Sequence, residues 1–397
     1  MDNLFGYYTF KSTKNIKFNL NTDKFPFGVN ISGLIQSEKG LGSAVRSDIE
    51  ALRVAGIPYV LNNITDLGSV NADKTYDSKD FSPDNPCLFN LIHVNPDVFV
   101  NFINEANMPY LNGHYNIGYW VWELDTIPEY WVALSKYVDE ISTPSYFSMQ
   151  AISKSLNIPV ARIPHSIAIT ENSFNKVIKK IDLKISDDIF LFLFIFDAGS
   201  FIERKNPFAL IEAFKKAFKP DEKVMLFIKS SRSNFNRTKF DEMLNAIKGY
   251  NITVSDLVLT RDEIYSLIYV CDSYVSLHRS EGFGLTMAEA MALGKPVIAT
   301  GYSGNMDFMN IDNSYPVDYR LVELDRDYGP YQKGNYWAEP DINHAAELMR
   351  EVFEKREESA SVGAKGKDYI KKYFSPEAVG KIYKARLNKI VYDYENR

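Results

Sequence analysis

The sequence predicts an α/β fold of two domains, each organised around a parallel β-sheet. The chain has 397 residues, which is too long for one ordinary core and suits two domains. Short apolar runs typical of buried strands alternate with amphipathic helical stretches, and this series occurs twice. A polar stretch without clear periodicity, residues 169–187, separates the two series. We therefore expect one domain over residues 1–175, a second over 176–372, and a terminal helix within 373–397.

The expected strands are short apolar runs bounded by polar or turn-forming residues. In the first half they are Gly28–Gly33, Pro58–Leu61, Cys87–Val94, Asn116–Tyr119, Glu140–Ser142 and Val160–Ile163. In the second half they are Ile189–Phe196, Val224–Lys229, Leu257–Leu259, Ser273–Leu277 and Val297–Ala299. Segments such as Pro207–Phe218 and His344–Phe353 are amphipathic and should be helices. The aromatic, turn-rich segment Asp318–Glu339 is predicted to be a loop.

Composition and charge exclude some classes of partner. Hydrophobic residues make up 45% of the chain and charged residues 24%, as in a soluble globular protein. The formal charge is −6 and the basic residues form no stripe, so nucleic acid is not an expected partner. Cys87 and Cys271 lie in or beside apolar runs and provide no disulfide framework, which fits a reducing compartment.

The apolar segments of the chain predict neither secretion nor a membrane span. The first residues, MDNLFGYYTFKSTKN, lack the pattern of a secretory signal. The longest apolar run, Ile189–Phe196, is too short to span a bilayer. We therefore expect a cytoplasmic protein whose contact with the inner membrane face, if it has one, is peripheral.

The most informative segment is SEGFGLTMAEAMALGKPVIA, residues 280–299. A strand-like run leads into Glu281, a turn Gly282–Gly284 follows, and a short helix then carries Glu289. Glycines allow a ligand to approach the backbone closely, and a helix N-terminus offers unpaired amides to an anion. Amides for phosphate and two carboxylates for hydroxyl groups would suit a nucleotide-sugar. The alternative is a surface helix with solvated glutamates after a buried strand.

These residues, with the following Thr300 and GYSGN, resemble the signature of retaining glycosyltransferases of the GT-B type, in the large family called group 1 or family 4. The resemblance implies two Rossmann-like domains facing across a cleft, with the final helix crossing back to the first domain. It implies that Glu281 holds hydroxyls of the donor sugar and that Glu289 holds the ribose hydroxyls. Amides of Phe283, Gly284 and Leu285 would meet the phosphates and the sugar. Each carboxylate can accept from a vicinal diol in charge-assisted bonds.

Basic residues after the first two strands of the second half are candidates for stabilising the leaving diphosphate. Family members commonly carry an arginine and, five residues later, a lysine; here these positions are Ser200 and Lys205. Arg204 is a candidate substitute for the missing arginine, although it could instead be a solvated surface charge. Lys229 ends the next predicted strand, at the edge where open α/β sheets bind ligands. Fixed cations there would oppose the negative charge that grows on the bridging oxygen.

A glycine-bearing loop follows the first strand and precedes a helix expected over Ser43–Ala55. In the family the matching loop approaches the donor diphosphate and shapes the acceptor pocket, which singles out Gly40 and Gly42. The alternative is an ordinary turn.

The acceptor side is predicted from the run GYWVWELD. Trp120 or Trp122 could stack on a sugar and Glu123 could bind an acceptor hydroxyl, whereas filling of the core is the equally weighted alternative. His93 and His165 each follow an apolar run and are not chosen as catalytic. No Cys or His cluster has zinc spacing, and the Asp-x-Asp match at Asp325–Asp327 is attributed to chance.

Together these features predict a retaining hexosyltransferase that needs no metal or other cofactor. GLGSAVR, RKNP, GNMDFM and YWAEPDINHAAELM look most similar to mannosyltransferases and related hexosyltransferases of O-antigen or capsule assembly, which makes GDP-mannose the first expected donor. The expected acceptor is a glycan or lipid-linked saccharide in surface polysaccharide synthesis. Two alternatives remain: a catalytically silent GT-B partner subunit, and a GT-B sugar-nucleotide epimerase.

Overall fold

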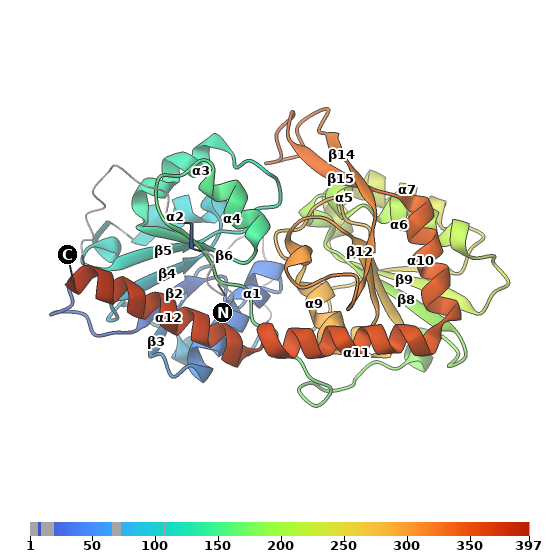
Figure 1. The fold of residues 1–397 in the computed structure, drawn as a ribbon, viewed down its shortest axis with the longest axis horizontal. Helices are drawn as coiled ribbons and strands as arrows, with labels where there is room; N and C mark the ends of the chain where they lie inside the picture. Colours follow the sequence, from blue (N-terminus) through green and yellow to red (C-terminus); the bar gives the residue numbers. More distant parts are fainter. Residues whose placement is uncertain (1–6, 9–19, 66–72, 107, 397) are drawn as a thin grey trace. The chain divides into compact units, whose positions relative to one another are not determined.

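The computed structural model describes residues 7–8, 20–65, 73–106 and 108–396. The chain packs into two units, residues 1–168 with 373–397, and residues 169–372 (Figure 1). Each unit contains its own largely parallel β-sheet flanked by helices. This arrangement confirms the predicted α/β fold with two Rossmann-like domains.

The sheet of the first unit has the order β1-β7-β6-β5-β4-β2-β3. Its strands are β1 (Tyr7–Tyr8), β2 (Val29–Gly33), β3 (Tyr59–Asn63), β4 (Phe89–His93), β5 (Tyr115–Tyr119), β6 (Glu140–Thr143) and β7 (Val160–Arg162). Its helices are α1 (Gly40–Val54), α2 (Pro96–Ala106), α3 (Glu129–Leu134), α4 (Tyr146–Ser153) and α12 (Pro376–Glu395). All neighbouring strands are parallel except β1, which pairs antiparallel with β7.

The C-terminal helix α12 packs on α1 and completes the core of the first unit. Gly380 allows this close packing, because a Cβ atom there would lie 2.4 Å from the carbonyl oxygen of Ala51. Arg386 of α12 pairs with the buried Glu140 of β6. The helix α12 is therefore part of the first unit, although it lies at the end of the sequence.

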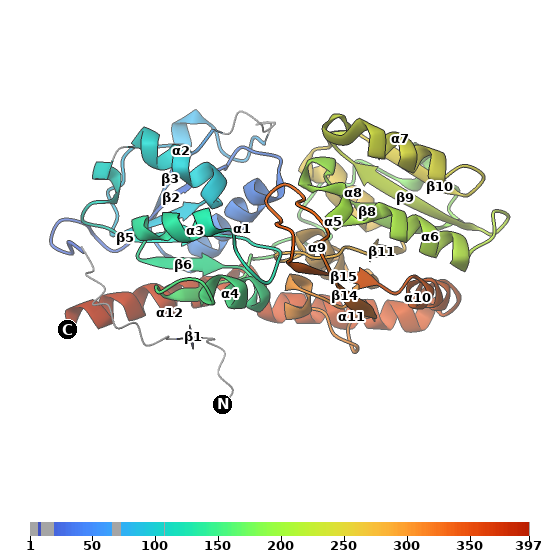
Figure 2. The same ribbon diagram turned by 90° about the horizontal axis from the view of Figure 1, so that it is seen from above.

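The sheet of the second unit has the order β10-β9-β8-β11-β12-β13, and all its pairs are parallel. Its strands are β8 (Phe190–Ile195), β9 (Val224–Ser230), β10 (Ile252–Asp256), β11 (Ser273–Ser276), β12 (Val297–Thr300) and β13 (Tyr315–Val317). Its helices are α5 (Ile202–Lys205), α6 (Pro207–Ala217), α7 (Arg237–Ala246), α8 (Arg261–Val270), α9 (Leu285–Ala292), α10 (Ile342–Glu354) and α11 (Arg356–Tyr373). Helices lie on both faces of this sheet (Figure 2).

Two sequence predictions in the second unit are wrong. The strand expected at Leu257–Leu259 is instead β10, at Ile252–Asp256, and Leu257 and Val258 are 57% and 55% exposed. Because β10 is an edge strand, it carries alternating polar residues rather than a continuous apolar run. The expected loop Asp318–Glu339 contains an antiparallel hairpin of β14 (Tyr319–Glu323) and β15 (Tyr336–Pro340).

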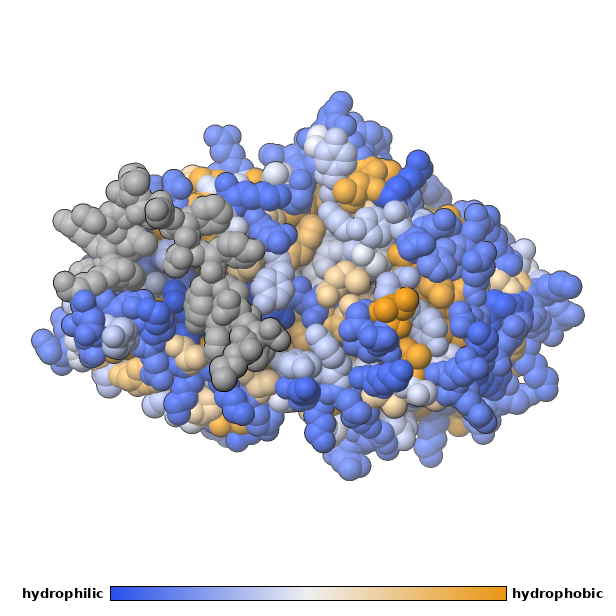
Figure 3. All heavy atoms as spheres, viewed as in Figure 1, coloured by the Kyte–Doolittle hydropathy of each residue, from blue (hydrophilic) through white to orange (hydrophobic). Residues whose placement is uncertain are grey.

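The surface in Figure 3 is mostly hydrophilic over the described atoms, with scattered hydrophobic patches. Among the described residues, no helix combines the length and apolar character that crossing a membrane requires.

Candidate active site

The strand order of the second sheet reverses between β8 and β11. From β8 the chain proceeds to β9 and β10, and it then returns to β11 on the other side of β8. Ligands of open α/β sheets bind beyond the carboxyl ends of the strands at such a switch point. The segment after β8 carries Arg204 and Lys205, and the segment after β11 carries Glu281. Topology thus brings the basic and acidic candidates together.

The turn that presents the two basic residues begins at Asp197, whose side chain accepts a hydrogen bond from the amide of Gly199 at 2.9 Å. Phe201 then adopts a left-handed conformation with φ of 62°, which is strained for an aromatic residue. The single-turn helix α5 (Ile202–Lys205) follows, and Asn206, which comes directly after it, is also left-handed. We call residues 197–206 the basic turn.

Both cations of the basic turn contact Glu281. The ammonium of Lys205 bonds to Oε1 of Glu281, and Nη1 of Arg204 lies 3.3 Å from its Oε2. Nη1 of Arg204 also donates to the carbonyl of Ser280 at 2.7 Å. Arg204 is buried, so the sequence alternative of a solvated surface charge is wrong for this residue.

The electrostatics of this group favour an ionised Glu281. Burial alone would raise its pKa, but the positive charges of Lys205 and Arg204 outweigh burial and hold the pKa at about 2. The carboxylate is therefore charged at neutral pH, which makes it a strong acceptor of hydrogen bonds from hydroxyl groups.

Two glycine-bearing segments form the backbone around Glu281. The amide of Glu281 donates to Oγ of Ser303 at 2.8 Å, and the amide of Gly304 donates to the carbonyl of Glu281 at 2.9 Å. A Cβ atom on Gly304 would lie 2.3 Å from the carbonyl oxygen of Gly282, so only glycine fits. The segment GYSGN, residues 301–305, therefore packs against the backbone of residues 281–282 and supports the loop that carries Glu281.

The three predicted amide donors lie at the start of α9. Gly284 precedes the helix with φ of 93°, a conformation that favours glycine, and Leu285 is the first helical residue. The ring of Phe283 is buried against Phe308, with centroids 5.2 Å apart. This packing fixes the orientation of the helix N-terminus.

Glu289 occupies the next part of the site, on the buried face of α9. Its Oε1 accepts from Arg261 at 3.1 Å and from the hydroxyl of Tyr265 at 3.4 Å. Both partners belong to α8, whose start is held by reciprocal hydrogen bonds between Thr260 and Glu263. Sequence reasoning missed Arg261 and Tyr265, because nothing in their local pattern distinguishes them from surface residues of an amphipathic helix.

The remaining predicted cation, Lys229, lies near the carboxyl end of β9, as the sequence predicts. It is buried, and it pairs in register with Ile195 at the end of β8. Lys229 therefore lies at the edge of the sheet from which the basic turn also begins.

The predicted glycines of the first unit differ in their surroundings. Gly42 lies inside α1, and a Cβ atom there would lie 2.0 Å from the carbonyl oxygen of Ser37. Gly40 is the first residue of α1, and a Cβ atom there would meet no heavy atom within 4 Å. The loop before α1 thus depends on Gly42, whereas Gly40 has space for a side chain.

The aromatic residues predicted for the acceptor side lie in the core of the first unit. The rings of Trp120 and Trp122 pack against Trp131, with centroids 5.6 and 4.8 Å away, and both tryptophans are buried. This is the core-filling arrangement. Glu123 follows at a half-buried position.

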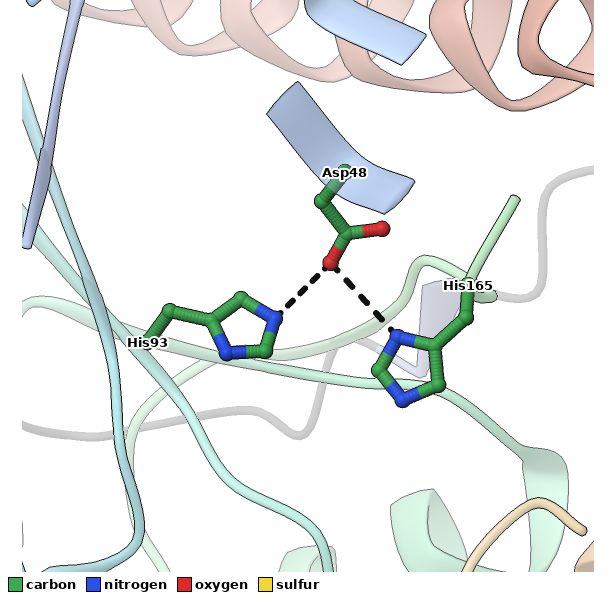
Figure 4. A group of neighbouring side chains, drawn as sticks. All are labelled: Asp48, His93 and His165. Carbon is green, nitrogen blue, oxygen red and sulfur yellow. Dashed lines mark hydrogen bonds and ion pairs between the residues drawn. The ribbon is translucent and has the colours of Figure 1, made fainter. Parts of the chain in front are cut away.

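One group of side chains in the described residues has the donor atoms of a metal site (Figure 4). Nε2 of His93 lies 2.8 Å from Oδ2 of Asp48, and Nδ1 of His165 lies 3.6 Å from the same oxygen. Such atoms can bind zinc. In the structure these atoms already have hydrogen-bond partners: Nε2 of His93 is bonded to Asp48, and Nδ1 of His165 lies 3.2 Å from the hydroxyl of Tyr119. We interpret the group as a hydrogen-bond network that joins α1, β4 and the segment after β7.

The Asp-x-Asp match lies in the β14–β15 hairpin. Asp325 accepts from the hydroxyl of Tyr328 at 3.0 Å, and Asp327 accepts from the amide of Lys333 at 2.7 Å. Both carboxylates thus stabilise the turn.

The second unit is similar to a known protein family. Residues 190–369 match the family model described as glycosyl transferases group 1. A search of the curated proteins finds no match to this chain.

Solved structures share the fold across nearly the whole chain. A glycosyltransferase from Rickettsia africae has a TM-score of 0.65 at 13% identity, covering 92% of this chain and 99% of its own. A sucrose-phosphate synthase from Thermosynechococcus elongatus has a TM-score of 0.65 at 15% identity, covering 93% and 100%. HepE of Anabaena, in complex with UDP and glucose, has a TM-score of 0.62 at 12% identity, covering 91% and 100%. The chain has the GT-B fold.

Proposed function

We propose that this protein transfers a hexose from a nucleoside-diphosphate sugar to a saccharide acceptor, with retention of the anomeric configuration. The observation that carries the proposal is the contact of Arg204 and Lys205 with Glu281 at the switch point of the second sheet. The match of residues 190–369 to group 1 glycosyl transferases supports the same reaction class.

The donor would occupy the site in three parts. Glu289 accepts hydrogen bonds from the ribose hydroxyls, in place of or beside those from Arg261 and Tyr265. Backbone amides at the start of α9 bind the diphosphate, because a helix N-terminus favours anions. Glu281 accepts hydrogen bonds from hydroxyls of the hexose. The low pKa of Glu281 keeps it an acceptor throughout the neutral range.

The basic turn supplies the electrostatic part of catalysis. As the bond between the anomeric carbon and the diphosphate breaks, negative charge grows on the bridging oxygen. Arg204 and Lys205 oppose that charge, and one such preorganised donor is worth about 3 kcal/mol. The acceptor hydroxyl attacks the same face of the sugar, its oxygen bonds to the anomeric carbon, and its proton passes to the departing diphosphate.

Release of nucleoside diphosphate from a panel of donors tests the proposal. GDP-mannose is our first candidate, and UDP-glucose is included because HepE is solved with UDP and glucose. We expect one donor to give acceptor-dependent release of diphosphate and an α-linked product from an α-linked donor. An inverted product would contradict retention, and no release from any donor would favour a silent partner subunit.

Two controls separate the remaining alternatives. Incubation with donor alone, followed by analysis of the sugar, detects an epimerase, which needs no acceptor. Dialysis against EDTA tests the proposed independence from metal, and we expect turnover to persist after it. The acceptors to test are lipid-linked saccharides of the kind used in surface polysaccharide synthesis, presented with and without membranes to detect peripheral association.

A further inference from the structure

The β14–β15 hairpin contacts the basic turn through Tyr331, whose ring meets Phe201, and through Arg279, which links Glu339 of β15 to the carbonyl of Glu203. Tyr328 and Tyr331 exchange two backbone hydrogen bonds, of 2.8 and 3.1 Å, and so close a tight turn at the hairpin tip. Gly329 lies inside this turn with φ of 60°. Tyr331 is 4% exposed although it lies in a loop. The tip is therefore packed against the rest of the second unit rather than solvated.

The residue that the hairpin tip covers is the strained Phe201. The rings of Phe201 and Tyr331 meet edge to face, with centroids 5.3 Å apart. A Cβ atom on Gly329 would lie 2.0 Å from Cζ of Phe201, so the ring of Phe201 occupies the space that the glycine leaves. A left-handed conformation of an aromatic residue persists only where surrounding contacts enforce it.

The same tip reaches Arg204 of the basic turn. The guanidinium carbon of Arg204 lies 5.8 Å from the centroid of the Tyr331 ring, within cation–π range. Arg279 anchors the base of the hairpin: its Nε donates to Glu339 of β15 at 2.8 Å, and its Nη1 donates to the carbonyl of Glu203 in α5 at 2.8 Å. The hairpin is thus attached to the basic turn at both its tip and its base.

We propose that Gly329 and Tyr331 are positioning residues, which hold Phe201 in its left-handed conformation and thereby keep Arg204 and Lys205 against Glu281. The catalytic part of this inference rests on the proposed function. Without the contact, Phe201 would relax toward an ordinary backbone conformation. The basic turn would then move, and both cations with it.

Steady-state kinetics of Tyr331→Ala and Gly329→Val test the inference. We expect kcat to fall about 10²-fold in each, the penalty for displacing reacting groups by about an ångström. Tyr331→Phe keeps the ring and should restore turnover close to that of the wild type. Leu321→Ala is the matched control, because this residue lies in β14 of the same hairpin and its side chain is exposed. Equal turnover of Tyr331→Ala and wild type would overturn the inference.

A double-mutant cycle separates positioning from loss of folding. Glycine adopts the left-handed conformation without steric cost, so Phe201→Gly removes the strain that the hairpin opposes. We expect the loss of kcat caused by Tyr331→Ala to be about tenfold smaller in the Phe201→Gly background than in the wild-type background. A coupling of this size is typical of residues in contact. Strictly additive losses would show that the hairpin acts elsewhere.

Titration of Glu281 tests the inference without relying on turnover. In the wild type the cations hold its pKa at about 2. Displacement of the basic turn in Tyr331→Ala should raise this pKa, as measured by NMR of protein labelled with ¹³C-glutamate. An unchanged pKa would overturn the inference. If the wild type transfers no sugar, the proposed function fails, and the titration still decides whether the hairpin positions the turn.

Discussion

At the scale of single residues, Glu281 is the carboxylate on which the proposed chemistry depends. Its side chain is 13% exposed and meets two cations, which come from adjacent residues of the basic turn. In the proposed reaction, a bound sugar shares this carboxylate with Arg204 and Lys205. The free protein thus holds the site charged and ordered by internal ion pairs, which is the preorganisation that electrostatic catalysis requires.

Replacement of Glu281 by glutamine tests its role with little change in shape. Glu281→Gln keeps the size of the side chain but removes the charge, so we expect kcat to fall by about 10²-fold or more. The thermal midpoint, followed by circular dichroism, should show that the fold persists. Glu354→Gln, an exposed substitution on α10, is the control for loss of a surface carboxylate. Near-normal turnover of Glu281→Gln would remove this residue from the site.

At the scale of elements, a close backbone contact explains why position 42 of the first unit is a glycine. Gly42 lies within α1, where glycine is a poor helix former, yet the carbonyl of Ser37 leaves no space for a side chain. The nearby Gly40 has such space. The two positions therefore provide a matched pair within one helix.

Alanine substitutions at these two glycines should have opposite effects. Gly42→Ala should lower the free energy of unfolding by about 1–3 kcal/mol, because the new methyl group must displace backbone. Gly40→Ala should leave stability unchanged or raise it by about 0.5 kcal/mol, since alanine restricts the unfolded chain. Urea unfolding followed by tryptophan fluorescence measures both. Equal destabilisation would mean that α1 begins elsewhere.

At the scale of the whole molecule, buried histidines in both units make stability depend on pH. Burial is the largest cause that lowers the pKa of His114, His165 and His278 below the usual 6.5. The unfolded chain therefore binds protons that the folded protein does not, between pH 6.5 and the lower folded values. Stability is full above pH 6.5 and is lost as the pH falls through this window.

We expect the free energy of unfolding to fall as the pH decreases from 7.5 to 5.5. Each histidine that stays neutral in the folded state contributes a slope of up to about 1.4 kcal/mol per pH unit below 6.5. Urea midpoints at several pH values measure this, and His165→Gln should reduce the slope. A midpoint that is the same at pH 7.5 and 5.5 would contradict the assignment of neutral buried histidines.

The sequence alone determined the alternation of strands and helices, because strands buried on both faces must be apolar along their length. It also determined the acidic motif, because Glu281, the glycine turn and Glu289 are close in the chain and their spacing is local information. The sequence misplaced β10 because the strand prediction relied on continuous apolar runs. An edge strand with alternating polarity lacks such a run.

Tertiary structure alone decided which distant residues meet. The strand order places the turn after β8 beside the loop after β11, which brings Arg204 to Ser280 and Glu281 although 76 positions separate Arg204 from Ser280. It also brings Asp48 to His93 and His165, and Tyr331 to Phe201. Such contacts depend on the order of strands in the sheet and on the β14–β15 hairpin, whose sequence looks like that of an irregular loop. Neither the strand order nor the hairpin produces a periodic pattern in the sequence.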